Sequence, residues 1–164
     1  MIALAKRTFA PALDFTTLGY ILVAGLAAAV AFDAFGQWLS PALGYARLSP
    51  APLAAQSLQV LFGPLDHARQ LGEIVHYLTG LIAYPIGYAF IALPFARSVF
   101  PRMHWSIVAT VYGVALWVFA LYVMAHLVAG NPPFLGFSGI TWVALIGHVI
   151  FALVLGAVLS RRIR

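Results

Sequence analysis

Apolar residues occur along the chain in four long runs, separated by shorter segments rich in proline, glycine and charge. A helix rises 1.5 Å per residue, so crossing the ~30 Å hydrocarbon core of a bilayer takes about 20 residues. Residues 17–39, 72–95, 105–129 and 140–160 meet this requirement. The pattern predicts an all-α integral membrane protein, a four-transmembrane-helix bundle that forms a single membrane domain over residues 1–164.

The longest connection, between the first two runs, has its own helical pattern. The stretch "SPAPLAAQSLQVLFG" begins with Ser49, a residue typical of helix N-caps, followed by Pro50. Its apolar positions include Leu53, Leu58 and Leu61. This spacing predicts a short amphipathic helix over residues 50–62 that lies on the outer surface of the membrane.

A secretory signal peptide is an alternative interpretation of the first apolar run, because the weakly basic segment "MIALAKRTFA" precedes it. Signal peptides have an apolar core of about 7 to 15 residues. The run over 17–39 is longer than that, so we interpret it as a true span.

Composition supports the membrane class. The chain of 164 residues is 63% hydrophobic and 8% charged, with a mean hydropathy of +0.99. A soluble domain carries roughly a quarter charged residues. The absence of cysteine excludes disulfides, thiolate metal sites and cysteine nucleophiles. The net charge of +5 does not indicate nucleic acid as a partner, because the basic residues flank the apolar runs.

The flanking cations predict the orientation. Cytoplasmic loops of membrane proteins carry an excess of lysine and arginine. If the N-terminus is cytoplasmic, seven basic residues lie on that side and two on the other; the seven are Lys6, Arg7, Arg97, Arg102, Arg161, Arg162 and Arg164, and the two are Arg47 and Arg69. Both termini are therefore expected in the cytoplasm (N-in/C-in).

Each predicted span places an ionisable side chain in its outer half. Counted from the outer helix ends, Asp33 lies about 9 Å deep, His76 and His126 about 6 Å, and His148 about 13 Å, with Glu73 close to the surface. Small residues at helical spacing follow two of the histidines and predict that these faces point inward; they are Gly80, Ala83 and Gly87, and Ala152, Gly156 and Ser160. On the third span a bulky stripe is expected to face inward; it comprises Tyr112, Phe119, Tyr122 and His126.

Two interpretations of these polar groups remain open. An ionisable side chain within a span is costly and marks a functional site by default. Three histidines with a carboxylate suit zinc, copper or iron, and two suit a b-type haem. The candidate ligands are His76, His126 and His148, with Asp33 and Glu73 added for a metal; by depth, His76 pairs better with His126 than with His148. Alternatively, these side chains only hydrogen-bond to one another or to water.

The second half of the chain resembles a family of small bacterial four-helix membrane proteins, the domain of unknown function numbered 6789. The resemblance covers about residues 72–160 and rests on "EIVHYLTGLIAYPIGYAFI", "GNPPFLGF" and "LIGHVIFALVLGAVL". Within these segments it depends on His76 with Gly80 and on His148 with Gly156. Ala152 stands where the family pattern implies a second glycine, and the 50–62 helix is longer than implied. The resemblance implies the four-helix fold and a bacterial inner-membrane location, without a reaction.

Three functional hypotheses follow. No catalytic motif occurs, so the leading prediction is a non-catalytic accessory subunit of a larger respiratory or photosynthetic membrane complex. Its expected partners are the lipid bilayer and other integral-membrane subunits or further copies of the chain, with no nucleic acid. The alternative is a redox protein that binds haem or a metal through the outer histidines. A small transporter or channel component is the weakest, because the inner half has no matching polar residues.

Overall fold

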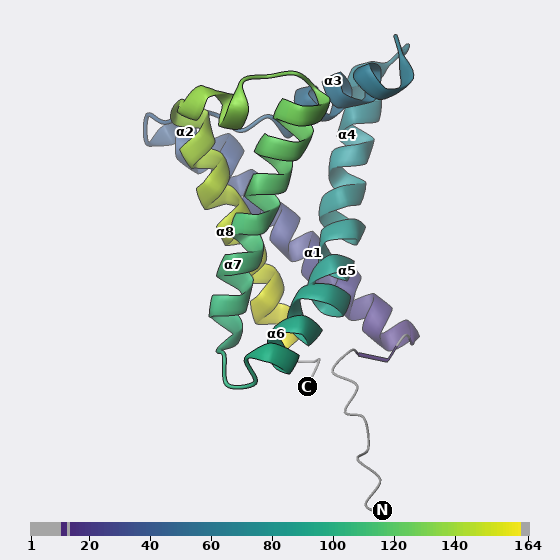
Figure 1. The fold of residues 1–164 in the computed structure, drawn as a ribbon, viewed down its shortest axis with the longest axis vertical. Coiled ribbons are helices and arrows are strands. Elements are labelled where there is room, and N and C mark those ends of the chain that lie inside the picture. The colour runs from purple at the N-terminus through teal and green to yellow at the C-terminus, as the bar shows by residue number, and fades with distance from the viewer. Residues whose placement is uncertain (1–10, 13, 162–164) are drawn as a thin grey trace, which may run out of the picture.

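Four helical rods, each long and apolar enough to cross a membrane, dominate the computed structural model, which describes residues 11, 12 and 14–161 (Figure 1). Spans 1 to 4, as we call them, cover Phe15–Ala42, Ala68–Val99, Trp105–Val128 and Gly139–Ser160. A shorter helix, α3 (Pro50–Phe62), connects spans 1 and 2, and no strand occurs in the described residues. The all-helical class and the four apolar helices are confirmed, with each end within about one helical turn of its predicted position.

Most spans contain π-helical segments, in which the N–H of residue i bonds to the carbonyl of residue i−5. Span 1 comprises α1 (Phe15–Asp33), the π segment η1 (Ala34–Leu39) and α2 (Ser40–Ala42). Span 2 comprises α4 (Ala68–Leu78), η2 (Thr79–Ala83), α5 (Tyr84–Gly87), η3 (Tyr88–Ala92) and α6 (Leu93–Val99). Span 3 comprises α7 (Trp105–Val118) and η4 (Phe119–Val128), and span 4 is α8 (Gly139–Ser160), preceded by the 3-10 turn η5 (Pro133–Phe137).

Proline accounts for three of these four wide segments. η1, η2 and η3 end two residues before Pro41, Pro85 and Pro94, respectively. Proline has no N–H, and its ring clashes with the carbonyl of residue i−4. A wider turn on the N-terminal side relieves that clash without ending the helix. η4 precedes no such proline, and the sequence offers no physical account of it.

Capping side chains begin two of the spans. Asp14 Oδ1 accepts a hydrogen bond of 2.7 Å from the Thr17 N–H, which starts α1 two residues before the predicted span. This bond lowers the pKa of the exposed Asp14 carboxyl. His104, which precedes α7, accepts from the Ser106 N–H through Nδ1. Its role is therefore to cap a helix, far from the other histidines.

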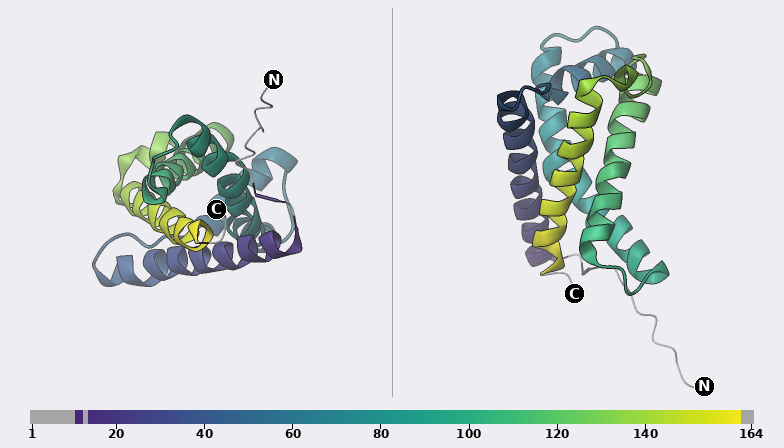
Figure 2. Two further views of the ribbon diagram at one scale, coloured as in Figure 1. Left: turned by 90° about the horizontal axis from the view of Figure 1, so that it is seen from below. Right: turned by 90° about the vertical axis from the view of Figure 1, so that its left-hand side faces the viewer.

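The spans run alternately up and down in the bundle (Figures 1 and 2). The start of α1, the end of α8 and the α6–α7 loop lie at one end, which we call the α6 end. Helix α3, α2 and η5 lie at the other, the α3 end. α8 packs between α1 and α7, and half of its most apolar stretch is buried (50%), against 28% in each other span. The N-in/C-in prediction depends partly on Lys6, Arg7, Arg162 and Arg164, which lie outside the described residues.

The spans approach most closely at glycines. A Cβ on Gly113 of α7 would lie 2.7 Å from the carbonyl oxygen of His148 and 2.8 Å from Cα of Val149 on α8. On α1, a Cβ on Gly25 would lie 2.5 Å from the carbonyl oxygen of Leu81. Such contacts between backbones are how helices associate in lipid, where no hydrophobic force drives them together.

The predicted inward faces are partly wrong. On α8, His148, Ala152 and Gly156 are buried, as predicted. On span 2, Ala83 is exposed, because the π segment η2 rotates the residues that follow it, so that Pro85 is buried instead. On span 3, Phe119 and Tyr122 of the predicted bulky stripe are 43% and 39% exposed. The predicted stripes assumed regular 3.6-residue turns, which η2 and η4 do not have.

Candidate functional site

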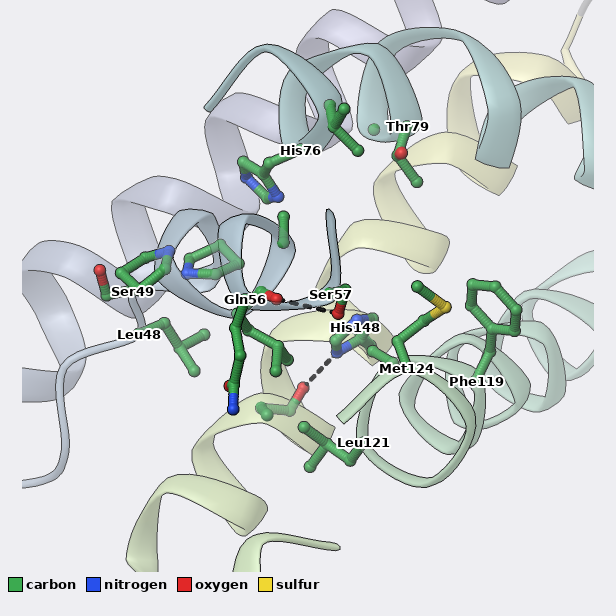
Figure 3. A pocket seen from close by; sticks show the side chains of 18 of the residues that line it. Leu48, Ser49, Gln56, Ser57, His76, Thr79, Phe119, Leu121, Met124 and His148 are labelled. Carbon is green, nitrogen blue, oxygen red and sulfur yellow. Dashed lines mark hydrogen bonds between the residues drawn. The ribbon is translucent and has the colours of Figure 1, made fainter. Parts of the chain in front are cut away.

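A cavity of about 550 Å³ lies inside the α3 end of the bundle (Figure 3). All four spans contribute to its wall, among them Ala29 and Phe32 from α1, Val75, His76 and Gly80 from span 2, Phe119, Leu121 and Met124 from η4, and Ala144, His148 and Phe151 from α8. Helix α3 covers it with Pro50, Leu53, Ser57 and Leu61 among others. The cavity is therefore a space between the spans, with a roof formed by a separate helix.

His148 is the more buried of the two histidines in the cavity wall. The residue is 9% exposed, and its Nδ1 lies 2.7 Å from the carbonyl oxygen of Ala144 on the same helix. A carbonyl only accepts, so Nδ1 carries the hydrogen and donates it. In the neutral ring, Nε2 is then an acceptor. The bond fixes the orientation of the ring and leaves one lone pair for a partner.

The Nε2 atom of His148 has no hydrogen-bond partner in the described residues. Tyr88 Oη is the one described side-chain nitrogen or oxygen that is both fully enclosed and without a hydrogen bond. The Nε2 atom of His148 is thus reachable from the cavity that this residue lines. Figure 3 shows the ring at the cavity wall, held by its bond to the backbone.

His76 lines the same cavity from span 2. Neither of its ring nitrogens has a hydrogen bond within the described part of the chain, so the ring can both donate and accept. Phe32 of α1 contacts both imidazoles, with ring centroids 6.1 Å from His76 and 5.3 Å from His148. The two histidines therefore share one neighbour and one cavity, whereas matched depth had paired His76 with His126.

The rest of the lining is mostly apolar and carries no charged side chain. None of the lining residues is Asp, Glu, Lys or Arg. The polar ones besides the histidines are Ser49, Gln56, Ser57, Tyr77, Thr79, Tyr84 and Asn131. Several of these are already engaged; Ser57, for example, donates to the Leu53 carbonyl of its own helix. A charged ligand would find no opposite charge in this wall, which favours a neutral one.

The other predicted ligands point elsewhere. His126 donates from Nδ1 to the Asn131 carbonyl (2.7 Å), which closes the turn after span 3. Asp33 accepts from Gln37 on its own helix and from the Tyr77 hydroxyl. Glu73 pairs with Arg69 at 3.5 Å, and both side chains are largely exposed. None of these three residues lines the cavity.

A metal site built from the five predicted ligands does not form in the described residues. No group of three His, Asp or Glu side chains within residues 11, 12 and 14–161 is placed to hold one ion. Asp33 does not line the cavity because it lies one position beyond Phe32, about 100° around the helix. The inward residue of α1 at this level is Phe32, which is 7% exposed.

The roof is fastened to span 3 by a pair of amides. Gln56 of α3 donates to the Ala129 carbonyl at 3.1 Å, and Asn131 donates to Gln56 Oε1 at 3.0 Å. Against span 2, the roof packs at Gly72, where a Cβ would lie 2.8 Å from the backbone nitrogen of Ala55. These contacts close the cavity toward the α3 end.

Phe32, Gln56 and Gly80 were missed as site residues in the sequence. Gly80 lines the cavity, and a Cβ there would have no neighbour nearer than 3.8 Å. Its spacing to His76 was the available signal, although we attributed it to close packing. The sequence contains no signal for Gln56, because its hydrogen-bond partner Asn131 lies 75 residues away.

The chain matches no protein-family model, and no curated protein and no solved structure is similar to it. The resemblance to the family numbered 6789 accordingly stays a prediction. What the cavity binds must be inferred from its shape and its lining.

Proposed function

We propose that the protein is a non-catalytic integral-membrane protein that binds a small, mostly apolar ligand in the cavity at the α3 end. One observation carries the proposal: two imidazoles with unpartnered ring nitrogens, His76 and His148, face a single apolar cavity of about 550 Å³. Ligand pockets have volumes of ~300 to 1,000 Å³, with mostly hydrophobic walls and a few polar groups that orient the ligand. This cavity has that size and that kind of lining.

The proposed orientation places the α6 end in the cytoplasm of a bacterial cell and the α3 end outside. Arg97 and Arg102 belong to the α6–α7 region, at the same end as the start of α1 and the end of α8. Arg47 and Arg69 belong to the segments at the α3 end. With Arg161 at the end of α8, the described residues place three arginines at the α6 end and two at the α3 end, which supports this orientation. The ligand cavity then lies in the outer leaflet.

Native mass spectrometry of protein released from mild detergent tests the proposal. We expect a small-molecule adduct on the wild-type chain and its loss in Gly80→Leu, because the added side chain would project into the cavity. The matched control is Gly19→Leu on α1, where a Cβ meets nothing within 4 Å and the new side chain faces lipid. An adduct that survives Gly80→Leu, or that both variants lose equally, would contradict the proposed site.

The haem or metal hypothesis is a second candidate, favoured by the way His148 is held. Metal-binding histidines usually donate their other ring N–H to a carbonyl or carboxylate, as His148 does to Ala144. A b-type haem between His76 and His148 would give a Soret band that is lost in His76→Ala. A metal would appear in equimolar amount by elemental analysis. A purified protein without chromophore or equimolar metal would eliminate this candidate.

The protein can belong to a larger respiratory or photosynthetic complex whichever ligand it binds. Partner subunits would contact the outer surface of the bundle, whereas the ligand would lie inside it. The outward face of α1 is apolar, with Leu22, Leu26 and Val30 between 50% and 59% exposed. Lipid or a neighbouring subunit can cover such a face. Comigration with partner proteins after mild detergent extraction is the expected result; a stable lone monomer would count against this prediction.

A further inference from the structure

We propose that the ligand is a neutral amphiphile with a hydroxyl group at its polar end, such as an alkylphenol, a hydroquinone or a long-chain alcohol. The hydroxyl donates its hydrogen to Nε2 of His148, and the apolar body fills the rest of the cavity. This inference rests on the proposed function, because it specifies the chemistry of the same site.

The hydrogen-bonding state of His148 determines whether the polar group of the ligand must donate or accept a hydrogen bond. Its Nδ1 hydrogen is already donated to the Ala144 carbonyl, so the neutral ring has only an acceptor left at Nε2. A ligand that only accepts, such as a quinone, an ether or an ester carbonyl, would set two lone pairs against each other. A hydroxyl supplies the missing hydrogen. The geometry therefore favours a donor over an isosteric acceptor.

His76 offers a second polar group at the wall of the same cavity. Its ring nitrogens have no partner in the described residues, and its ring shares Phe32 as a neighbour with His148. A hydroxyl oxygen that donates to His148 still has lone pairs to accept a hydrogen from His76. The hydroxyl can therefore donate to His148 and still accept a further hydrogen bond, whereas a methyl ether can only accept.

The lining excludes charged heads. A carboxylate, phosphate or ammonium group would be removed from water with no opposite charge among the lining residues. The propionates of a haem meet the same difficulty, since no lysine or arginine lines the cavity. The apolar part of the ligand would instead contact Phe119, Leu121 and Met124 of η4, opposite the span 2 wall.

The edge of the cavity between spans 2 and 3 provides a route from the bilayer. Val75 on span 2 and Phe119 on span 3 both line the cavity, and they are 37% and 43% exposed. At this partly open edge, an amphiphile dissolved in the outer leaflet can reach the cavity sideways, without displacing the α3 roof.

The test compares two ligands that differ only in the hydroxyl hydrogen, 4-decylphenol and 4-decylanisole. Their binding to the full-length protein in detergent is measured by isothermal titration calorimetry. We expect the phenol to bind about tenfold more tightly, because the ether leaves a buried acceptor unsatisfied. In His148→Phe the two ligands should bind equally, and in Gly80→Leu neither should bind. Gly19→Leu should retain the wild-type preference.

The outcomes separate this inference from the proposed function. Equal binding of phenol and ether to the wild type overturns the hydroxyl inference and leaves the ligand site intact. Failure of both ligands to bind ligand-free protein overturns both proposals. Tighter binding of 4-decylbenzoate than of the phenol would contradict a neutral ligand. If His148→Phe does not fold, the comparison of the two ligands on the wild type still decides whether the site prefers a hydroxyl to an ether.

Discussion

The two ends of the bundle contain similar residues but pack in different ways. At the α6 end, Tyr88, Leu155 and Leu159 are less than 2% exposed, and the spans interlock closely. At the α3 end, the same spans surround a cavity of about 550 Å³. Glycine occurs in both kinds of packing: Gly113 brings α7 into contact with the backbone of α8 at His148 and Val149, whereas Gly80 borders open space. A small residue in a membrane helix therefore indicates either close approach or a cavity, and only its surroundings distinguish the two.

The largest expected effect comes from adding one methyl group where the backbones touch. In Gly113→Ala, Cβ would lie 2.7 Å from a backbone oxygen that cannot rotate away. Overpacking of this kind costs about 1 to 3 kcal/mol. We expect a clear decrease in the thermal unfolding midpoint in detergent. A midpoint equal to that of the wild type would mean that α7 and α8 are farther apart than the structure places them.

Release of the roof should have a smaller and more local effect. Gln56→Ala removes the bonds to Ala129 and Asn131, worth about 1 kcal/mol in total for partly exposed groups. Amide hydrogen exchange should increase in α3 and stay unchanged in α8. The matched control is Gln59→Ala, an exposed residue on the same helix. Equal exchange in the two variants would show that the amide pair does not hold the roof.

The hydroxyl of Tyr88 offers a stabilising substitution at the well-packed end. This oxygen is enclosed and has no hydrogen-bond partner in the described residues. Burying an unpaired hydroxyl costs ~1 to 3 kcal/mol in proteins. Tyr88→Phe should therefore raise the unfolding midpoint, by a free energy of about 1 kcal/mol. A lower midpoint would reveal a partner for the oxygen, such as a bound water.

The smallest effect is expected for the same methyl addition at the cavity. A Cβ on Gly80 meets Phe151 at 3.8 Å and Ala29 at 3.9 Å, which are ordinary van der Waals contacts. Alanine also favours a helix over glycine by about 0.5 to 1 kcal/mol. Gly80→Ala should therefore leave the midpoint unchanged or raise it slightly. A destabilisation as large as that of Gly113→Ala would remove the distinction between a glycine at a close approach of backbones and a glycine at a cavity.

Hydropathy alone was enough to predict the four spans, because lipid requires long apolar helices with few exceptions. The helix over 50–62 was predicted from its N-cap residue Ser49, Pro50 and the spacing of its apolar residues. Spacing also identified the inward face of α8, including His148 and Gly156. Two features were beyond this reasoning. The π segments shift helical register, so Ala83 was assigned to the wrong face, and Asp33 was chosen where the adjacent Phe32 points inward. The cavity itself depends on how far span 2 diverges from span 3, which no local pattern encodes.

The wide turn η2 has a consequence for how the chain tolerates insertions and deletions. A π segment holds more residues per turn than an α-helix, so span 2 carries spare length between His76 and Pro85. The wide turn can absorb a deletion of one residue there, so Pro85 and the residues after it would keep their direction around the helix axis. The same deletion in α8, which has no π segment, would turn every residue after it by about 100°. Span 2 is therefore expected to tolerate a change of length that α8 would not.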